Sequence, residues 1–115
     1  YNMPSINKAI LLGHVGHTPR LVQSRSGTPA TSISLATSKT IYRNDGSYES
    51  KTEWHRVVAY GRIAENICAY VQKGNLLWIE GEMHTRSYTG RDGLPKTVTE
   101  VIATNTQFFR NEPAR

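Results

Sequence analysis

One stretch of this sequence has helical periodicity, and segments with the character of strands lie on both sides of it. Apolar residues within residues 62–73 recur at the spacing of one helical face: Ile63, Ile67, Tyr70 and Val71. Lys73 followed by Gly74 is typical of the end of a helix. Alternating or β-branched residues indicate three strands before this helix and two after it, over residues 6–15, 30–38, 53–60, 76–88 and 98–109. The chain is therefore predicted to be all-β with a single helix between strands 3 and 4.

This order of elements fits a five-stranded OB-fold β-barrel, and a small open α+β sheet is the alternative. Closure into a barrel removes the exposed edges that an open sheet would have. Gly13 and Gly16 interrupt the first strand, and glycines inside a strand often mark a sharp bend. The first strand is therefore expected to contribute to two sides of the barrel. In the second strand, small side chains on one face leave space for something to lie against it: Ser32, Ser34, Ala36 and Ser38.

Length and charge limit what such a barrel can do. The 115 residues suffice for one compact domain, expected over residues 4–110, with residues 111–115 as the start of a C-terminal tail whose remainder is absent. The net charge of +5 and the sequence pI near 9.6 indicate an anionic partner. The single cysteine, Cys68, excludes an internal disulfide, and no apolar run approaches the ~18–20 residues of a membrane span. A soluble intracellular protein with no membrane partner is expected.

The predicted strand around residues 52–60 carries two aromatic side chains and a cation on the same face. Strand alternation places on that face Trp54, Arg56, Val58 and Tyr60. If this face were barrel core, Arg56 would be buried with the rings, and an unpaired arginine is almost never fully buried. We therefore expect the face to be exposed, with Trp54 and Tyr60 available for nucleobase stacking. Such stacking contributes ~1–3 kcal/mol per base and tolerates any base sequence.

A similar arrangement recurs in the strand predicted over residues 76–88. One parity holds the side chains expected in the core, Leu77, Ile79 and Met83. Arg86 and Tyr88 have the other parity, so they are expected to point outward and to lead into a basic, Gly-rich loop over residues 89–95. Trp78 shares their parity, and we interpret it as part of a subunit interface rather than as a stacking platform.

Many Lys and Arg side chains are candidates for phosphate contacts. Any single one is equally well explained as ordinary solvated surface, but they gather around the aromatic strands, above all in the polar hairpin arm over residues 39–51. Cations arranged in this way would follow a phosphate backbone, with an affinity that falls steeply as salt rises. The candidates are Lys8, Arg20, Lys39, Arg43, Lys51, Arg56, Arg62, Lys73, Arg86, Arg91 and Lys96.

Recognisable catalytic and metal-binding patterns are missing from the sequence. His14 and His17 form an HxxH pair, but in a strand this odd spacing sends the two side chains to opposite faces. Cys68 lies alone in the predicted helix, so no set of zinc ligands is present. The Gly13-x-x-Gly16 segment lacks the Lys-Ser/Thr pair of a phosphate-binding loop. We therefore expect no enzymatic activity, no catalytic residues, no metal and no cofactor.

Short blocks, in chain order, resemble bacterial single-stranded DNA-binding proteins over nearly the whole sequence. They are INKAILLGHVG at residues 6–16, LATS at 35–38, TEWHRVV at 52–58, YVQKG at 70–74, IEG at 79–81, TR at 85–86 and TEV at 99–101. The resemblance implies an OB fold that binds and protects single-stranded DNA during replication, recombination and repair. It also implies a location in the bacterial cytoplasm, associated with the nucleoid.

The same resemblance implies site residues and partners. The stacking positions of the family fall on Trp54, Tyr60, Tyr88 and, in the hairpin arm, Tyr42. A homotetramer is implied, with a dimer as the alternative, and subunit contacts are expected at His55, Leu76 and Trp78. Replication and repair proteins are expected as partners only if the full-length protein has an acidic C-terminal tail.

Two other functions stay open at this point. The first is an interaction module of a replication-restart complex, which would be a dimer that binds DNA weakly. The second is a nuclease on the same barrel, which would cleave labelled single strands in the presence of a divalent metal. RNA also stays open as the ligand, because stacking and phosphate contacts serve both nucleic acids.

Overall fold

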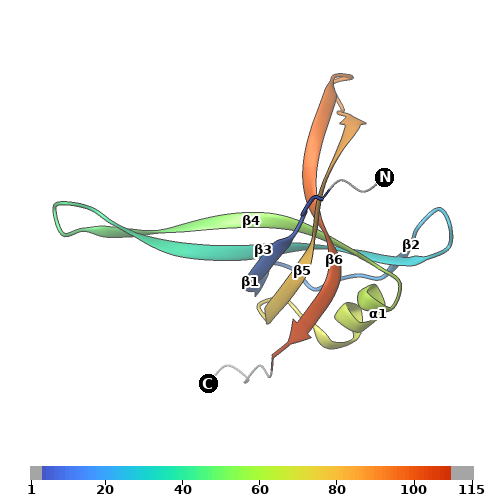
Figure 1. Ribbon diagram of the computed structural model, residues 1–115, viewed down its shortest axis with the longest axis horizontal. Helices are drawn as coiled ribbons and strands as arrows, with labels where there is room; N and C mark the ends of the chain where they lie inside the picture. The colour runs from blue at the N-terminus through green and yellow to red at the C-terminus, as the bar shows by residue number, and fades with distance from the viewer. Residues whose placement is uncertain (1–3, 110–115) are drawn as a thin grey trace.

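The computed structural model describes residues 4–109 and shows a β-barrel from which two long hairpin arms extend (Figure 1). Its elements are β1 Ala9–Val15, β2 Val22–Gln23, β3 Pro29–Tyr42, β4 Tyr48–Tyr60, α1 Gly61–Tyr70, β5 Leu76–Thr89 and β6 Pro95–Phe108. β1 pairs with both β5 and β3, so β1, β5, β6, β4 and β3 close into a ring. The predicted five-stranded OB-type barrel with a single helix is confirmed.

Closure depends on the bend in the first strand. β1 pairs with β5 from Ala9 to His14, and its last two residues, His14 and Val15, pair with β3. A Cβ atom at Gly13 would lie 2.2 Å from the carbonyl oxygen of Ala36, so the missing side chain lets β1 approach β3. The ring is completed by β4 and β6, which are the only parallel pair among the described strands. The prediction that the first strand contributes to two sides of the barrel is confirmed.

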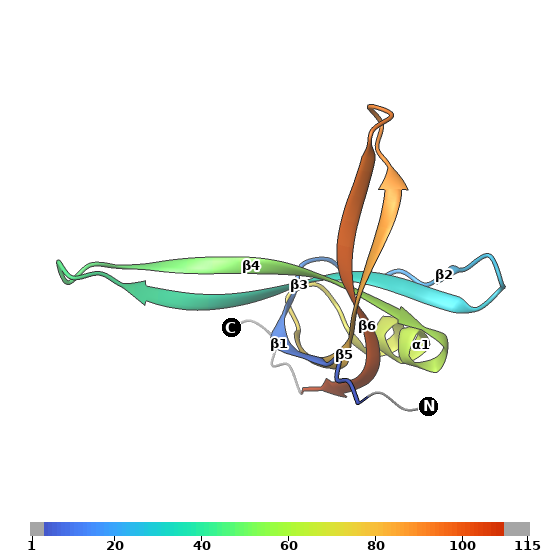
Figure 2. The same cartoon turned by 45° about the horizontal axis from the view of Figure 1, so that its top comes forward.

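The core fills the inside of this ring. Its fully buried side chains come from alternate positions of the strands, and α1 adds Ala64 and Ile67 from beside the barrel (Figure 2). The largest of them are Ile33, Leu35, Ile67, Leu77 and Ile79. Each such side chain stabilises the fold by roughly 1.5–3 kcal/mol relative to an exposed one. Within residues 4–109, no helix is long and apolar enough to cross a membrane.

The structure corrects the predicted position of the helix. α1 lies between β4 and β5 rather than between strands 3 and 4, because the two-residue strand β2 adds one strand to the count. Two residues are too few to show an alternating pattern. The helix also ends at Tyr70 and not at residue 73, since Val71 already has an extended backbone and Gly74, with φ of 89°, belongs to the following turn.

Met83 was predicted to lie in the core, and this is wrong, because its side chain is 52% exposed. The pairing of β5 with β6 shifts register between Glu80 and Gly81. Beyond this point both strands leave the barrel and form the second arm, just as the ends of β3 and β4 form the first (Figures 1 and 2). Both faces of an arm reach solvent, so alternation no longer separates core from surface. Residues 110–115, which include the predicted tail, lie outside the described residues.

Candidate nucleic-acid interface

Three of the predicted stacking side chains lie exposed, two on the outer side of the barrel and one near the tip of the β5–β6 arm. Trp54 is 59% exposed, Tyr60 47% and Tyr88 44%. Val57 and Ala59, which alternate with Trp54 and Tyr60, are fully buried. The predicted alternation is confirmed at these positions, whereas Val58 of the predicted outward face is only 8% exposed. A core position for the two rings is excluded.

A buried carboxylate joins the two arginines of this face. Glu100 of β6 is only 5% exposed, and it accepts a hydrogen bond from Nε of Arg56 on β4. Nε of Arg86 on β5 donates to its other carboxylate oxygen at 2.8 Å. Among residues 4–109 neither guanidinium makes a further hydrogen bond, so the terminal nitrogens of both are available to an anion. We call these three residues the arginine cluster.

The charges of the arginine cluster support one another. Burial by itself raises the pKa of the Glu100 carboxyl, but the hydrogen bonds and charges of Arg86 and Arg56 outweigh it, and the pKa lies below its ordinary value. The hydrogen bond to Glu100 in turn raises the pKa of Arg86. Two positive charges and one negative charge leave the cluster with a net positive charge at neutral pH. The Arg86 guanidinium also lies 5.9 Å from the centre of the Tyr88 ring, within the range of a cation–π contact.

Three neighbouring hollows lie along this side of the barrel, and two of them are lined by the arginine cluster. The middle hollow shares Arg56 and Arg86 with the hollow beside Tyr88, and it shares Val22 and Ser32 with a hollow on its other side. We call the three together the barrel groove. Arg20 lies at one end of it and Tyr88 at the other, with Tyr60 and the arginine cluster between them. A chain of nucleotides in this groove would meet aromatic rings and cations in turn.

The β3–β4 arm carries the fourth predicted stacking residue. Tyr42 is exposed and lies opposite Tyr48, with 6.1 Å between the ring centres. Both tyrosines share the strand parity of Trp54, on the same side of the hairpin. Arg43 follows Tyr42 and is paired with Glu49 at 2.6 Å. Tyr48 was not predicted as a stacking residue, although alternation from Trp54 along the same strand indicates it.

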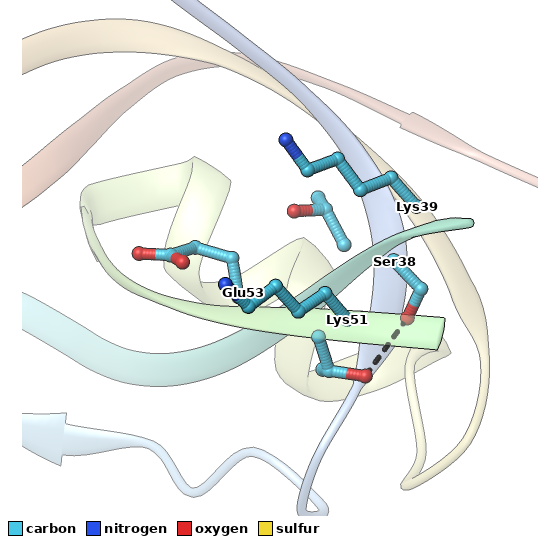
Figure 3. A pocket seen from close by; sticks show the side chains of 6 residues that line it. Ser38, Lys39, Lys51 and Glu53 are labelled. Atoms are coloured by element: carbon cyan, nitrogen blue, oxygen red, sulfur yellow. Dashed lines mark hydrogen bonds between the residues drawn. The ribbon is translucent and has the colours of Figure 1, made fainter. Parts of the chain in front are cut away.

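Two predicted phosphate contacts lie on the other parity of the same arm. Lys39 and Lys51 are directly opposite each other in the hairpin, and they border a hollow together with Glu53 (Figure 3). Within the described range, no carboxylate lies within 4.0 Å of either ammonium group. Like charges directly opposite in a hairpin are destabilising, so this pair is open to an anion.

The structure brings some of the remaining predicted cations to the groove and not others. Arg20 lines the groove, whereas Lys73 does not line it and only its backbone N–H donates to the Thr18 hydroxyl at 3.2 Å. Arg91 and Lys96 lie on the β5–β6 arm, where Lys96 is opposite Tyr88. Two of the predicted cations lie elsewhere: Arg62 on α1, and Lys8, which is paired with Glu80.

An apolar surface covers the strands β1 and β5. Leu12 and Ile10 of β1 are exposed there, and the half-buried Trp78 lies directly opposite Leu12. Leu76 has the same parity two residues before Trp78. His55, the third residue predicted for subunit contacts, lies on the barrel-side parity of β4 and shares a hydrogen bond of 2.8 Å with the Thr37 hydroxyl. Leu76 and Trp78 are thus brought together, but His55 lies on a different element.

Comparison with known proteins decides the family. The model described as "Single-strand binding protein family" matches residues 6–109. The chain belongs to this family. The predicted family membership is confirmed. The chain is also similar to bacterial proteins, among them a single-stranded DNA-binding protein of Xanthomonas axonopodis that is 39% identical over 104 residues. A second one, from Neisseria meningitidis, is 34% identical over 110 residues.

The chain matches only part of these single-strand binding proteins. The aligned segment covers 90% of this chain and 58% of the Xanthomonas protein, and 94% of this chain and 63% of the Neisseria protein. A solved structure of the same family, Plasmodium falciparum SSB in complex with ssDNA, superimposes with a TM-score of 0.84 at 34% identity. The superimposed part covers 96% of this chain and 100% of the Plasmodium falciparum chain. The OB-type barrel is thus shared with a protein that was solved with single-stranded DNA.

Glu100 is the main feature of this single-strand binding domain that sequence reasoning missed. The signal was present, because Val101 and Ala103 alternate with it and are buried, which places Glu100 on the outer face of β6. An outward carboxylate on a basic face predicts a partner cation. Among residues 4–109, no group of three or more His, Cys, Asp or Glu side chains could hold a metal ion.

Proposed function

We propose that this chain binds single-stranded DNA in the barrel groove, without preference for base sequence and without catalysis. Bases stack on Tyr60 and Tyr88 in the groove and on Trp54, which lies outside the groove on the strand face of Arg56 and Tyr60. Arg56 and Arg86 contact phosphates. Through this activity the protein protects single strands during replication, recombination and repair in the bacterial cytoplasm. The names of its relatives and the solved complex with ssDNA support the proposal.

The observation that carries the proposal is the arginine cluster between exposed rings. A buried Glu100 fixes two guanidiniums through Nε and leaves their outer nitrogens to a ligand. Tyr60 lines the groove on one side of them and Tyr88 on the other. A backbone phosphate fits the guanidiniums, and any base has a π-face that fits the rings. No base-specific acceptor or donor pattern is needed for this mode of binding.

A fluorescence titration with oligo(dT) tests the proposal. Binding is expected to quench tryptophan emission, and the association constant is expected to fall as salt rises, with a slope of roughly −0.7 per phosphate contacted. The change Trp54→Ala removes the most exposed of the three rings. It is expected to weaken binding about 10-fold and to abolish most of the quenching, because it removes one base–ring stack.

Tyr70 supplies the matched control for this experiment. It is an exposed aromatic residue on α1 whose ring contacts Phe108, and it lies away from the strand face that carries Trp54, Arg56 and Tyr60. Tyr70→Ala should bind oligo(dT) as the parent does. Parent protein that gives neither quenching nor salt-dependent binding would contradict the proposed function. Equal effects of Trp54→Ala and Tyr70→Ala would contradict the stacking role of Trp54 alone.

We also propose that the apolar surface of β1 and β5 joins copies of this chain into a homotetramer. Leu12 lies at its centre, exposed beside Trp78. Leu12→Glu would bury a carboxylate in that interface, so a lower molar mass is expected by light scattering. Leu94→Glu, at an exposed apolar position on the β5–β6 arm, is the control and should leave the mass unchanged. A parent that is a stable dimer and binds oligo(dT) weakly would instead favour an interaction module.

A further inference from the structure

Trp54 does not project freely into solvent but lies along the barrel surface. It starts on β4 directly opposite Ala36 of β3. The far edge of its indole ring reaches Gly16, where a Cβ atom would lie 2.6 Å from Cζ3 and 3.1 Å from Cη2 of the ring. The backbone N–H of Gly16 donates to the carbonyl oxygen of Ser34 at 2.8 Å, so Gly16 lies beside β3. The ring therefore crosses β3 on its way from β4 to Gly16.

Small residues make this arrangement possible. Ser34 and Ala36 are half-buried on the face of β3 that the ring crosses, and neither carries a side chain large enough to lift it. The indole thus has one side toward the barrel, while 59% of the residue is exposed. A base stacks on a ring only when a whole face of that ring is accessible.

The backbone does not explain why residue 16 is a glycine. Five glycines of the chain have a positive φ, and each of them has open space where a Cβ would stand: Gly27, Gly46, Gly61, Gly74 and Gly93. Gly16 is not among them, so its φ is open to any residue. What it lacks is room, since carbon atoms in contact lie about 3.5–4.0 Å apart and not 2.6 Å. The nearest neighbour that occupies this room is the indole ring, and the backbone carbonyl oxygen of Ser34 follows at 3.3 Å.

We propose that Gly16 is a positioning residue for nucleobase stacking, because its missing side chain lets the Trp54 ring lie flat across β3 with its outer face open. The proposal rests on the proposed function. It assigns a role in DNA binding to a residue that acts through Trp54 and does not itself contact DNA. One methyl group at position 16 displaces the ring edge by about 1 Å and tilts the face that receives the base. The loss of affinity is then transmitted through the Trp54 ring, which is the nearest contact of the added methyl group.

Gly16→Ala tests the proposal when it is measured with and without Trp54. Gly16→Ala is expected to weaken oligo(dT) binding about fivefold, since part of one base–ring stack is lost. It is also expected to shift the emission of Trp54, after subtraction of the emission of a Trp54→Phe variant that retains only Trp78. In a Trp54→Ala background the same change should have no effect on affinity, because no ring is left to displace. Matched losses in both backgrounds would overturn the proposal.

Thermal unfolding keeps the test decisive if Gly16→Ala destabilises the fold. A clash with the ring predicts that any loss of melting temperature disappears when Trp54 is also alanine. A loss that persists in the double variant would place the role of Gly16 in the backbone and overturn the proposal. Two results on affinity separate this inference from the proposed function. If the parent fails to bind oligo(dT), both fall; if the parent binds and Gly16→Ala binds with parental affinity and emission, only the inference falls.

Discussion

Replacement of Arg56 and Arg86 together by alanine is expected to weaken oligo(dT) binding on the order of 100-fold at low salt. In the proposed binding mode each guanidinium donates a charge-assisted hydrogen bond to a phosphate, and such bonds contribute about 1.5–3 kcal/mol. The change also leaves Glu100 as an unpaired negative charge in the middle of the barrel groove. The arginine cluster thereby changes from net positive to net negative, and the remaining charge repels the DNA backbone.

Two measurements check this expectation. Titrations at two salt concentrations should show that the dependence of log K on log salt becomes shallower by about 1.4, which corresponds to two phosphates on a single strand. Adding Glu100→Gln to the double variant should restore roughly 10-fold in affinity, because it removes the repelling charge but returns neither arginine. Such a recovery of affinity would show that the Glu100 charge repels the DNA, because a change in the shape of the groove would not be reversed by Glu100→Gln.

A second pair of cations controls for net charge. Lys8→Ala with Arg62→Ala removes the same number of positive charges from positions that do not line the groove. Its effect should stay several-fold smaller than that of the arginine pair, since only long-range attraction is lost. If the two double variants lose the same affinity and show the same change in salt dependence, binding depends on the overall charge of the protein and not on the groove.

Strand alternation was enough to place the aromatic residues. Arg56 shares a face with Trp54 and Tyr60, and an unpaired arginine keeps such a face out of the core. Both rings are indeed exposed, and Val57 on the other parity is buried. Alternation is a local property of the backbone, and for this reason it can be read from sequence.

Glu100 shows what alternation cannot supply. It lies on the outer parity, where a carboxylate is normally exposed, yet it is buried because arginines from β4 and β5 cover it. The three strands are brought together by the parallel pairing of β4 with β6 and the antiparallel pairing of β5 with β6. Contacts between residues so far apart in the chain depend on the register of the strands, which no local pattern determines.

The small residues of the second predicted strand were correctly predicted to leave space on one face of that strand. The sequence did not show that a side chain of the same protein fills this space. Ser34 and Ala36 were expected to admit something against their face. The structure shows that the indole of Trp54 lies over them. Met83 is a similar case, because its parity was right but the strand leaves the barrel after Gly81. In both cases the local pattern gave the face, and the tertiary arrangement decided what it meets.

Glu100→Gln is expected to cost about 1–2 kcal/mol of unfolding free energy at pH 7, and much less near pH 3. The pKa of Glu100 in the folded protein lies below its ordinary value of 4.5. The stability that its ionised form contributes is therefore fully present above that value and is lost as pH falls through the lowered pKa. This loss of unfolding free energy is smaller than the usual cost of breaking a buried ion pair, since the two arginines that cover Glu100 are half-exposed and can hydrate.

Chemical denaturation of the parent and of Glu100→Gln at several pH values between 7 and 3 measures this difference. Glutamine keeps the size and one acceptor oxygen of Glu100, so the difference reports the charge rather than a cavity. Asp45→Asn is the control. Hydrogen bonds from Ser47 also lower the pKa of Asp45, but Asp45 lies exposed at the tip of the β3–β4 arm and its replacement should change stability little. A Glu100→Gln difference that stays constant from pH 7 to pH 3 would show that the arginines do not hold the carboxylate in its ionised form.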